Sequence, residues 1–341
     1  MVIQMKPTDF ANHLTEFLSV YLPSQKNVSK NTIYSYRDTF KLLLRYCRDI
    51  QTIPVERITV SLLTSDLITG FLQWLETERR CSISTRNQRL AAIHSFFHYL
   101  QGEEPSGLYH FQKVMSIPIK KASKTTVAHL IPDAIKLLLE QPDKHTLRGR
   151  RDLTLLSVLY DTGARVQELI DIRVEDVILD SPSVVSLHGK GNKTRRVPLM
   201  KNTVSLLQSY LTENHLDKPW KNQNSLFSNS QHHPLTKEGV AYIIAKYVAS
   251  ARKLSTIVPP KVNPHMVRHS KAMHLLQAGV NLIYIRDFLG HVDIKTTEIY
   301  ARADTETKRK AIENAYPDLI DSNLPDWNKD QELLAWLSEL K

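Results

Sequence analysis

Glycine and cysteine are both scarce in this chain. Glycine accounts for 10 of 341 residues, about 3% against an average near 7%. Few glycines leave few tight turns, which argues against a many-stranded fold and favours a mainly helical one. The two cysteines, Cys47 and Cys81, lie in apolar helical contexts without metal-ligand spacing. We therefore expect free thiols in a reducing compartment, not a disulfide framework or a zinc site.

The sequence also lacks any long apolar segment. Nowhere do 18 uncharged apolar residues follow one another, and the N-terminal MVIQMKPTDF has no long apolar run. No period of 20–50 residues repeats, which argues against the common repeat architectures. We therefore expect a cytoplasmic globular protein, and 341 residues are enough for two domains.

What the chain has in excess is positive charge. Lys and Arg together number 45 against 35 Asp and Glu, which gives a formal net charge of +10. Such an excess suits a polyanionic partner, because each neutralised phosphate releases bound counterions. A basic protein without such a partner has the same composition, so charge alone leaves both interpretations open.

The first hundred residues contain four runs of apolar residues at helical spacing. We expect these helices over about 8–22, 29–47, 64–75 and 84–100. Ser29 precedes the second run, and Thr64 or Ser65 can cap the third. Helices of this number and length can pack as a bundle, so we assign residues 1–103 to a first, helical domain.

Basic side chains gather on this predicted bundle. Lys30 and Arg37 belong to the second run, and Arg86 and Arg89 share one face of the fourth because they are three residues apart. A DNA-binding face and a solvated helix face both fit this pattern. The rest of the chain has to decide between them.

Two further segments complete the predicted domain organisation. Residues 104–130 lose apolar periodicity and carry Lys120 and Lys121, so we predict a basic interdomain linker that can lie along a phosphate backbone. Residues 318–341 end in an apolar helix. This helix can pack on its own domain or on a neighbouring protomer, and the sequence leaves the choice open.

The predicted second domain, residues 131–317, is mostly helical. We expect its helices over about 132–140, 150–160, from 164 onwards, 201–213, 236–253, 264–278, 281–288 and 294–300. Two short runs, 184–187 and 194–199, flank HGKGNK, which contains the turn residues of a hairpin. The fold class expected for the chain is therefore mainly α with one small β-hairpin.

The residues with the clearest chemistry lie in one stretch, 263–301. In it, His265, Arg268 and His291 precede Tyr300. A phenol with a free pKa of about 10 is a weak nucleophile at neutral pH, so it needs a base for its proton and cations for the developing charge. The combination indicates phosphoryl chemistry with the phenol as nucleophile, and a DNA phosphodiester fits the basic composition.

Four segments, in this order along the chain, resemble the signature boxes of the tyrosine recombinases, the phage-integrase and Xer-like group. They are TGARVQEL, GKGNKTRRVPL, HMVRH and LGHVDIKTTEIY. The N-terminal SKNTIYSYRDTFKLLLRYC and STRNQRLAAIHSFFHYL are similar to the family's core-binding domain. The resemblance covers roughly residues 8–316 and implies a core-binding helical domain followed by the family's catalytic domain.

The resemblance implies a phosphate-binding group of side chains. Arg165 and Arg268 would clamp the scissile phosphate, because planar guanidinium groups match phosphate oxygens bidentately and stay charged. His291 would donate a hydrogen bond to a phosphate oxygen. Glu168, three residues after Arg165, would orient the site without transferring a proton.

The resemblance also implies the groups that move protons and form the covalent bond. Tyr300 would be the nucleophile and would form a 3′-phosphotyrosyl intermediate. His265 would be the acid/base partner for the nucleophile's proton. Lys190, on the hairpin turn, would protonate the leaving 5′-oxygen, with Lys193 as a rival or an additional DNA contact.

Other residues of suitable type are assigned to structure. We expect His269 and His274 to be structural histidines and Tyr284 to occupy a core position of a short helix. His265 and His269 stand four residues apart, as zinc ligands can, but no third ligand follows at a suitable spacing. We therefore expect no metal and no other cofactor.

The family resemblance implies a site-specific recombinase or integrase of a bacterium or mobile element. Its partner would be duplex DNA with a specific site, and four protomers would exchange strands through a Holliday junction. Two alternatives use the same fold: a type IB topoisomerase-like enzyme, and a DNA-binding regulator that no longer cleaves. The regulator would be expected to lack a catalytic residue, and the sequence retains all six.

Overall fold

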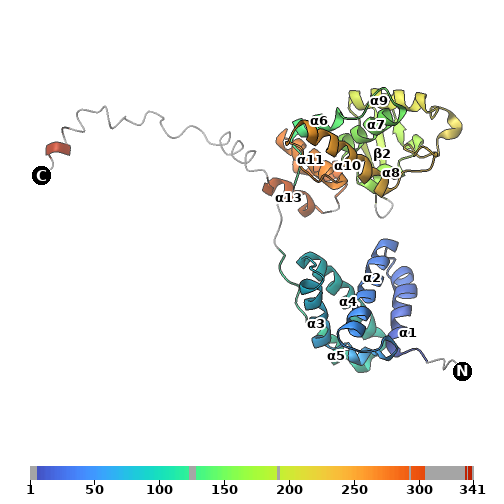
Figure 1. Ribbon diagram of the computed structural model, residues 1–341, viewed down its shortest axis with the longest axis vertical. Coiled ribbons are helices and arrows are strands. Elements are labelled where there is room, and N and C mark those ends of the chain that lie inside the picture. The colour runs from blue at the N-terminus through green and yellow to red at the C-terminus, as the bar shows by residue number, and fades with distance from the viewer. Residues whose placement is uncertain are drawn as a thin grey trace. The chain divides into compact units, whose positions relative to one another are not determined.

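The computed structural model describes residues 6–122, 128–189, 193–291 and 293–303, together with Ala335 and residues 337–339. The chain divides into two compact units, Met1–Thr125 and Thr126–Lys341. Figure 1 shows both units and labels most of their helices. The predicted C-terminal helix belongs to residues 318–341. Of these, the structure describes only Ala335 and residues 337–339.

The first unit is entirely helical in its described part. Its long helix α4 (Ile83–Glu103) contacts α2, α3 and α5. The other elements are α1 (Asp9–Glu16), the π-helical η1 (Phe17–Gln25), α2 (Lys30–Asp49), α3 (Ser65–Thr77), α5 (Leu108–Met115) and the short 3₁₀ helices η2 (Val55–Arg57), η3 (Val60–Leu62) and η4 (Pro105–Gly107). The four helices expected from the apolar spacing are therefore confirmed.

Hydroxyl side chains begin the main helices of this unit. Ser29, Thr64 and Ser82 each accept a hydrogen bond from the backbone N–H three residues later, which satisfies one of the free donors at a helix start. Of the two candidates for the cap of α3, Thr64 is the cap. The cap of α4 is Ser82, so this helix begins slightly before the predicted position near residue 84.

The predicted linker, residues 104–130, begins too early. Phe111 and Val114 of α5 are 1% and 0% exposed and belong to the core of the first unit. Sequence reasoning missed α5 because a helix of eight residues contains too few turns to establish a period. Residues 123–127 of the predicted linker lie outside the described part of the chain.

The second unit combines helices with one small sheet. Its helices are α6 (Pro132–Leu139), α7 (Leu147–Thr162), α8 (Val166–Asp171), η5 (Val174–Asp176), α9 (Lys201–Glu213), η6 (Pro219–Lys221), α10 (Lys237–Leu254), α11 (Pro264–Gln277), α12 (Leu282–Leu289) and α13 (Lys295–Ala303). Every helix predicted from the spacing in residues 132–300 is present. The mainly helical fold class is confirmed.

The sheet contains the predicted hairpin and one additional short strand. Strands β2 (Val184–His188) and β3 (Thr194–Pro198) pair antiparallel, with Val185 opposite Val197. The two-residue strand β1 (Val177–Ile178) pairs with the other edge of β2, and its shortness hid it from sequence analysis. One face of β2 and β3 carries Val185, Leu187 and Val197, all buried.

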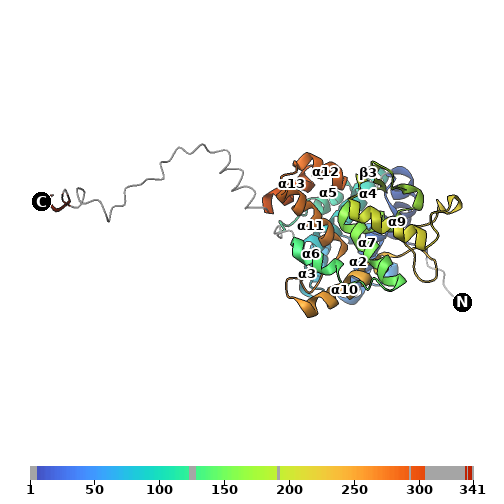
Figure 2. The ribbon, with the colours of Figure 1, turned by 90° about the horizontal axis from the view of Figure 1, so that it is seen from above.

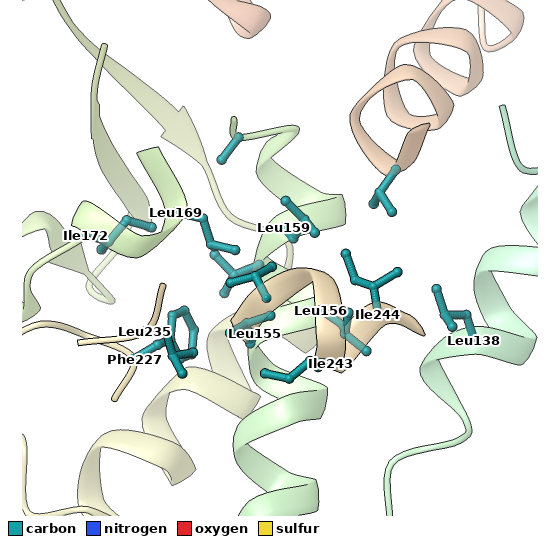
Figure 3. Close-up of a cluster of buried hydrophobic side chains, with 14 of the residues drawn as sticks. Leu138, Leu155, Leu156, Leu159, Leu169, Ile172, Phe227, Leu235, Ile243 and Ile244 are labelled. Carbon is teal, nitrogen blue, oxygen red and sulfur yellow. The ribbon is translucent and has the colours of Figure 1, made fainter. Parts of the chain in front are cut away.

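The main core of the second unit surrounds α7. Figure 3 shows Leu155, Leu156 and Leu159 of this helix among side chains from other elements, including Ile243 and Ile244 of α10. Because α7 is buried along most of its length, its C-terminal end is held firmly. That end carries the first of the predicted site boxes.

Helices α11, α12 and α13 share a smaller apolar cluster. Figure 2 shows these three helices side by side, and they contact one another in pairs. The cluster includes Met273 of α11, Leu289 of α12 and Tyr300 of α13. The predicted nucleophile is therefore part of a hydrophobic core. No helix in the described residues is long and apolar enough to cross a membrane.

Candidate active site

Arg165 stands at the start of α8, directly after the turn that ends α7. Gly163 ends α7 in the left-handed conformation, with φ of 56°. The backbone N–H of Arg165 donates to Glu168 Oε2 at 2.8 Å, and its Nη1 donates to Glu168 Oε1 at 2.7 Å. The Arg165 side chain remains 38% exposed. Its guanidinium is thus oriented by the protein and still accessible to a ligand.

Arg268 of α11 is buried beside this turn, with 3% exposure. Its Nη1 donates to Gly163 O at 2.7 Å, and its Nη2 donates to Leu289 O at 2.6 Å. Both acceptors lie at helix C-termini, where backbone carbonyls lack intrahelical partners. Burial and the charge of Arg165 lower the pKa of Arg268 to about 9, so it remains a cation at neutral pH.

Glu168 joins three guanidinium groups. Besides Arg165, it accepts from Arg195 Nη1 and Nη2 at 2.9 and 2.8 Å, and Arg268 Nη1 lies 3.9 Å from its Oε2. Burial by itself raises the pKa of this carboxyl, but the hydrogen bonds from Arg195 and Arg165 outweigh burial and bring the pKa to about 2. Glu168 is therefore an anion that fixes the spacing of the cations around it.

Arg195 is a site residue that sequence reasoning missed. It lies on β3 with its side chain 13% exposed, and its Nε donates to Phe288 O at 2.9 Å. The signal was present in the alternation of the strand, because Arg195 shares a face with the buried Val197 two residues later. Through this side chain, the hairpin is joined to Glu168 and to the end of α12.

Gly290 allows the end of α12 to approach the arginines. Its φ is +64°, and its carbonyl accepts from Arg165 Nη2 at 3.4 Å. A Cβ at this position would lie 2.9 Å from Arg195 Nη1 and 3.0 Å from Arg195 Cδ. Both the left-handed backbone and the close approach of Arg195 therefore require glycine here.

The contact at Gly290 predicts a stability effect with two parts. Gly290→Ala should lower the free energy of unfolding by about 1–2 kcal/mol, because an alanine is strained in the left-handed conformation. It should lower it further because Arg195 must move away from the added Cβ. The matched control is Gly279→Ala, where φ is +82° and no described atom lies within 4 Å of the added Cβ. Urea unfolding of both variants measures the difference. Equal losses would contradict a role for the approach of Arg195.

Two predicted histidines flank the arginines. His265 is exposed at the surface, but desolvation of its ring and the charges of Arg268 and Arg165 lower its pKa. His291 Nδ1 lies 2.9 Å from Thr297 Oγ1, and burial together with the same two arginines lowers its pKa to about 4. Both rings are therefore neutral at neutral pH. In the described residues no group of three His, Cys, Asp or Glu side chains is arranged to hold a metal ion.

Tyr300 is fully buried, with 0% exposure. Its hydroxyl oxygen lies 2.8 Å from His269 Nδ1, and its ring is stacked near the ring of His291 at a centroid distance of 6.5 Å. Burial raises the pKa of Tyr300, while Arg268 and Arg165 partly offset this rise. The phenol therefore lies within the electrostatic field of both arginines. The imidazole that contacts it belongs to His269, to which the sequence analysis assigned only a structural role.

The structure differs from one further expectation about the tyrosines. Tyr284, which we expected in a core position of α12, is 69% exposed. The apolar residues on either side of it obscured which face of this short helix points inward. Its exposure makes Tyr284 a useful comparison residue for Tyr300.

The hairpin turn is described only at its base. Lys190, the predicted acid, lies outside the described residues, and Lys193 is exposed. At the base, Gly189 N–H donates to Lys193 O at 2.8 Å. His188 lies 2.8 Å from Asp176 Oδ1 through its Nε2 and 3.0 Å from Thr194 Oγ1 through its Nδ1. These contacts fix the start of the turn that carries Lys190.

The DNA contact predicted for Arg86 is corrected by its burial. This side chain is 4% exposed, its Nη1 donates to Pro118 O at 3.0 Å, and its Nε lies 3.5 Å from Glu76 Oε1. Arg89 is half-buried, and its Nη1 donates to Ser35 O at 2.9 Å. Arg86 therefore ties α4 to the segment after α5. A DNA contact of Arg89 remains a prediction.

The other basic residues predicted to contact DNA in the first unit are exposed. They are Lys30, Arg37, Lys120 and Lys121. Lys120 lies 2.8 Å from Glu76 Oε1, and Arg37 forms an exposed ion pair with the next residue at 3.0 Å. Ion pairs on the surface are weak, so they do not prevent these side chains from meeting a phosphate. Their DNA contacts remain predictions.

Family models match most of the chain. The model described as "Phage integrase family" matches residues 128–307, and "Phage integrase, N-terminal SAM-like domain" matches residues 14–104. The first of these ranges contains all six residues predicted to be catalytic. The second contains α2, α3 and α4 and the last three residues of α1.

Related proteins and structures extend over similar lengths. The chain is 34% identical to "Putative integrase/recombinase y4rC" of Sinorhizobium fredii over 98% of this chain and 99% of that protein. It is 32% identical to "Tyrosine recombinase XerD" of Listeria innocua over 85% of this chain and 93% of that protein. A Tn1549 transposon integrase in complex with transposon right end DNA is similar in fold, with a TM-score of 0.67 at 17% identity over 88% of this chain and 98% of that one.

Proposed function

The chain belongs to the phage integrase family, and we propose that it is a site-specific tyrosine recombinase that cleaves and rejoins duplex DNA through Tyr300. The observation that carries the residue assignment is the arrangement of Arg165 and Arg268 on one carboxylate, Glu168, with the phenol of Tyr300 inside their field. Such an arrangement suits a reaction in which a phosphate gains negative charge beside a nucleophilic oxygen.

The two arginines bind the scissile phosphate in this mechanism. The hydrogen bonds from Arg268 to Gly163 O and Leu289 O use one N–H of each terminal nitrogen, and each such nitrogen carries a second N–H. Arg165 is more exposed and approaches the phosphate from the solvent side. Because the protein already orients both groups, little reorganisation is needed when charge develops in the transition state.

The reaction then proceeds in two transesterification steps. Tyr300 is 0% exposed in this structure, so its hydroxyl has to become accessible when DNA binds. Its Oη then attacks the phosphorus, the bond to the 5′-oxygen breaks, and a 3′-phosphotyrosine and a free 5′-hydroxyl result. Lys190 is the proposed acid for the leaving 5′-oxygen, and His291 donates to a phosphate oxygen. Since the covalent link conserves the energy of the phosphodiester, a 5′-hydroxyl can attack it and rejoin a strand without ATP.

The biological reaction is proposed from the same family membership. Four protomers on two DNA sites would exchange strands in pairs through a Holliday junction, and residues 318–341 would supply a contact between protomers. The protein would act in the cytoplasm, consistent with its free cysteines, on the DNA of a mobile element. Neither a topoisomerase-like enzyme nor a non-cleaving regulator is favoured by any feature of the site.

Arg165→Ala tests the phosphate clamp. A nicked suicide duplex, chosen by selection from a random pool or from inverted repeats beside the gene, should trap a covalent adduct with the wild-type protein. Loss of one preorganised cation should slow adduct formation by about 10²- to 10³-fold. Duplex binding, followed by fluorescence anisotropy, should change little because many phosphate contacts remain.

The matched control for this test is Arg173→Ala. Arg173 is 55% exposed and forms a long ion pair with Glu175 at 3.8 Å, so its removal should leave both cleavage and binding unchanged. If Arg165→Ala lost binding in parallel with cleavage, the clamp role would be wrong. Absence of any adduct with the wild-type protein on its bound site would contradict the proposed function itself.

A further inference from the structure

The β-hairpin carries one histidine that the proposed reaction does not use. His188 ends β2, and its side chain is 51% exposed. Its Nε2 lies 2.8 Å from Asp176 Oδ1, and its Nδ1 lies 3.0 Å from Thr194 Oγ1. Thr194 is the residue opposite His188 on β3. One imidazole therefore joins both strands of the hairpin to η5 at the point where the turn begins.

The hydrogen bond from His188 to Asp176 has a fixed direction and a fixed acceptor. Carboxylate oxygens only accept, so Nε2 donates whether the imidazole is neutral or charged, and the Thr194 hydroxyl can donate to Nδ1 or accept from it. Asp176 is 8% exposed, and its Oδ2 accepts from the backbone N–H of Arg173 at 2.9 Å. Because η5 holds this carboxylate in place, Asp176 can hold the end of β2.

The base of the turn lies beside the phosphate-binding arginines. A Cβ at Gly189 would lie 3.4 Å from Glu168 Oε1, which is the oxygen that accepts from Arg165 Nη1 at 2.7 Å. On the other strand, Arg195 donates to Glu168 Oε1 and Oε2 at 2.9 and 2.8 Å. Glu168 therefore holds the β3 side of the turn, and the bond from His188 to Asp176 holds the β2 side.

The proposed acid, Lys190, follows directly on this base. In the sequence it stands between Gly189 and Gly191, and glycine restricts the backbone less than any other residue. A proton donor has to come within hydrogen-bond reach of the atom it protonates, and a displacement of about 1 Å can cost 10²-fold in rate. Since neighbouring glycines supply little constraint, the constraint on the donor has to come from the base of the turn.

We propose that His188 is a positioning residue for the transfer of a proton from Lys190 to the leaving 5′-oxygen, and that it acts through its hydrogen bond to Asp176. This inference rests on the proposed role of Lys190. As the bond between phosphorus and the 5′-oxygen breaks, Lys190 Nζ gives its proton to that oxygen. In rejoining, the attacking 5′-hydroxyl returns a proton to the Lys190 amine. His188 exchanges no proton in either step.

The test compares two leaving groups in adduct formation by His188→Ala. One suicide duplex contains the ordinary phosphodiester, and the other contains a 5′-bridging phosphorothiolate, whose sulfur leaves without a proton donor. On the phosphodiester, His188→Ala should form the adduct about 10- to 100-fold more slowly than wild type, because the acid is misplaced. On the phosphorothiolate, its rate should stay within about threefold of wild type, because no acid is needed.

The two substrates separate a positioning role from a general loss of structure. A variant with a damaged fold or a damaged phosphate clamp slows on both duplexes alike, so equal losses would overturn the proposal. A wild-type rate of His188→Ala on the phosphodiester would overturn it as well. His188→Gln should recover most of the lost rate, because the amide nitrogen of Gln can still donate to Asp176 Oδ1. No recovery in His188→Gln would contradict the part assigned to Asp176.

Three further variants complete the experiment. Lys190→Ala should lose about 10²- to 10⁴-fold on the phosphodiester and little on the phosphorothiolate. If Lys190→Ala slowed both alike, the acid proposed for the reaction would be wrong, whereas a normal result for Lys190 with no effect of His188→Ala contradicts only His188.

The double variant and a matched control address the coupling between the two residues. In the Lys190→Ala background, His188→Ala should cause no additional loss on the phosphodiester, because the side chain that it positions is absent. A further loss of about tenfold there would show an independent role and would overturn the proposal. The control is His145→Ala, an exposed histidine before α7, which should keep the wild-type rate on both duplexes.

Discussion

Tyr300→Phe should form no covalent adduct with a suicide substrate while it still binds the duplex. Phenylalanine fills the same apolar space between α11 and α12 but has no oxygen to attack phosphorus. The fold should survive, because the substitution removes one buried hydrogen bond, to His269 at 2.8 Å, which contributes about 1 kcal/mol. Denaturing electrophoresis of labelled DNA measures the adduct directly.

The matched control for this substitution is Tyr284→Phe. Tyr284 is also a tyrosine of the catalytic unit, but it is 69% exposed and lies on the previous helix, α12. Its variant should form the adduct at the wild-type rate. If the adduct persisted in Tyr300→Phe and disappeared in Tyr284→Phe, the nucleophile would be the exposed Tyr284 and not Tyr300.

Glu168→Gln should cost more stability than most single substitutions in this chain. The amide removes the only charge that balances Arg165, Arg195 and Arg268 at this point, within the described residues. Removal of one partner of a buried ion pair costs about 3–5 kcal/mol. For a unit of this size, a loss of about 3 kcal/mol corresponds to a fall of roughly 6–12 °C in Tm.

The contribution of Glu168 to the stability of the folded protein depends on pH in a defined direction. Its folded pKa, about 2, is below the ordinary value of 4.5, so its contribution is complete above pH 4.5 and is lost as the pH falls towards 2. The difference in Tm between wild type and Glu168→Gln should therefore be constant near neutrality and should narrow in acid. Calorimetry of the full chain at several pH values measures this difference.

Glu213→Gln is the matched control for Glu168→Gln. Glu213 pairs with Arg150, but the two side chains are 24% and 37% exposed, so solvent screens the pair and its loss should cost less than about 1 kcal/mol. If Glu168→Gln cost no more than this control, Glu168 would not be the anion that holds the three arginines.

Local patterns predicted the elements and the residue types of the site. Helix positions followed from apolar spacing and hydroxyl caps, and the hairpin followed from HGKGNK between two apolar runs. The errors came from short segments. Helix α5, strand β1 and the inward face of α12 contain too few residues for a period to identify them.

The partners of the site residues could not be predicted in this way. Spacing placed Arg86 beside Arg89 on one helix face and suggested a DNA contact, but a carbonyl 32 residues away, on Pro118, accepts from the buried Arg86. In the sequence, Arg195 is one of several basic residues near a predicted turn. In the structure it donates hydrogen bonds to Glu168, which lies 27 residues earlier in the chain. Burial decided both cases.

The sequence by itself determined which chemical groups the protein has for its reaction: a phenol, two arginines, a lysine and several histidines, in an order that resembles one family. Only the tertiary structure decided how they are paired. It placed Glu168 among three guanidiniums and His269, instead of His265, on the Tyr300 hydroxyl. The physical reason is that residue types and helical faces are local properties, whereas a hydrogen bond between α11 and α13 depends on how the helices pack around a shared core.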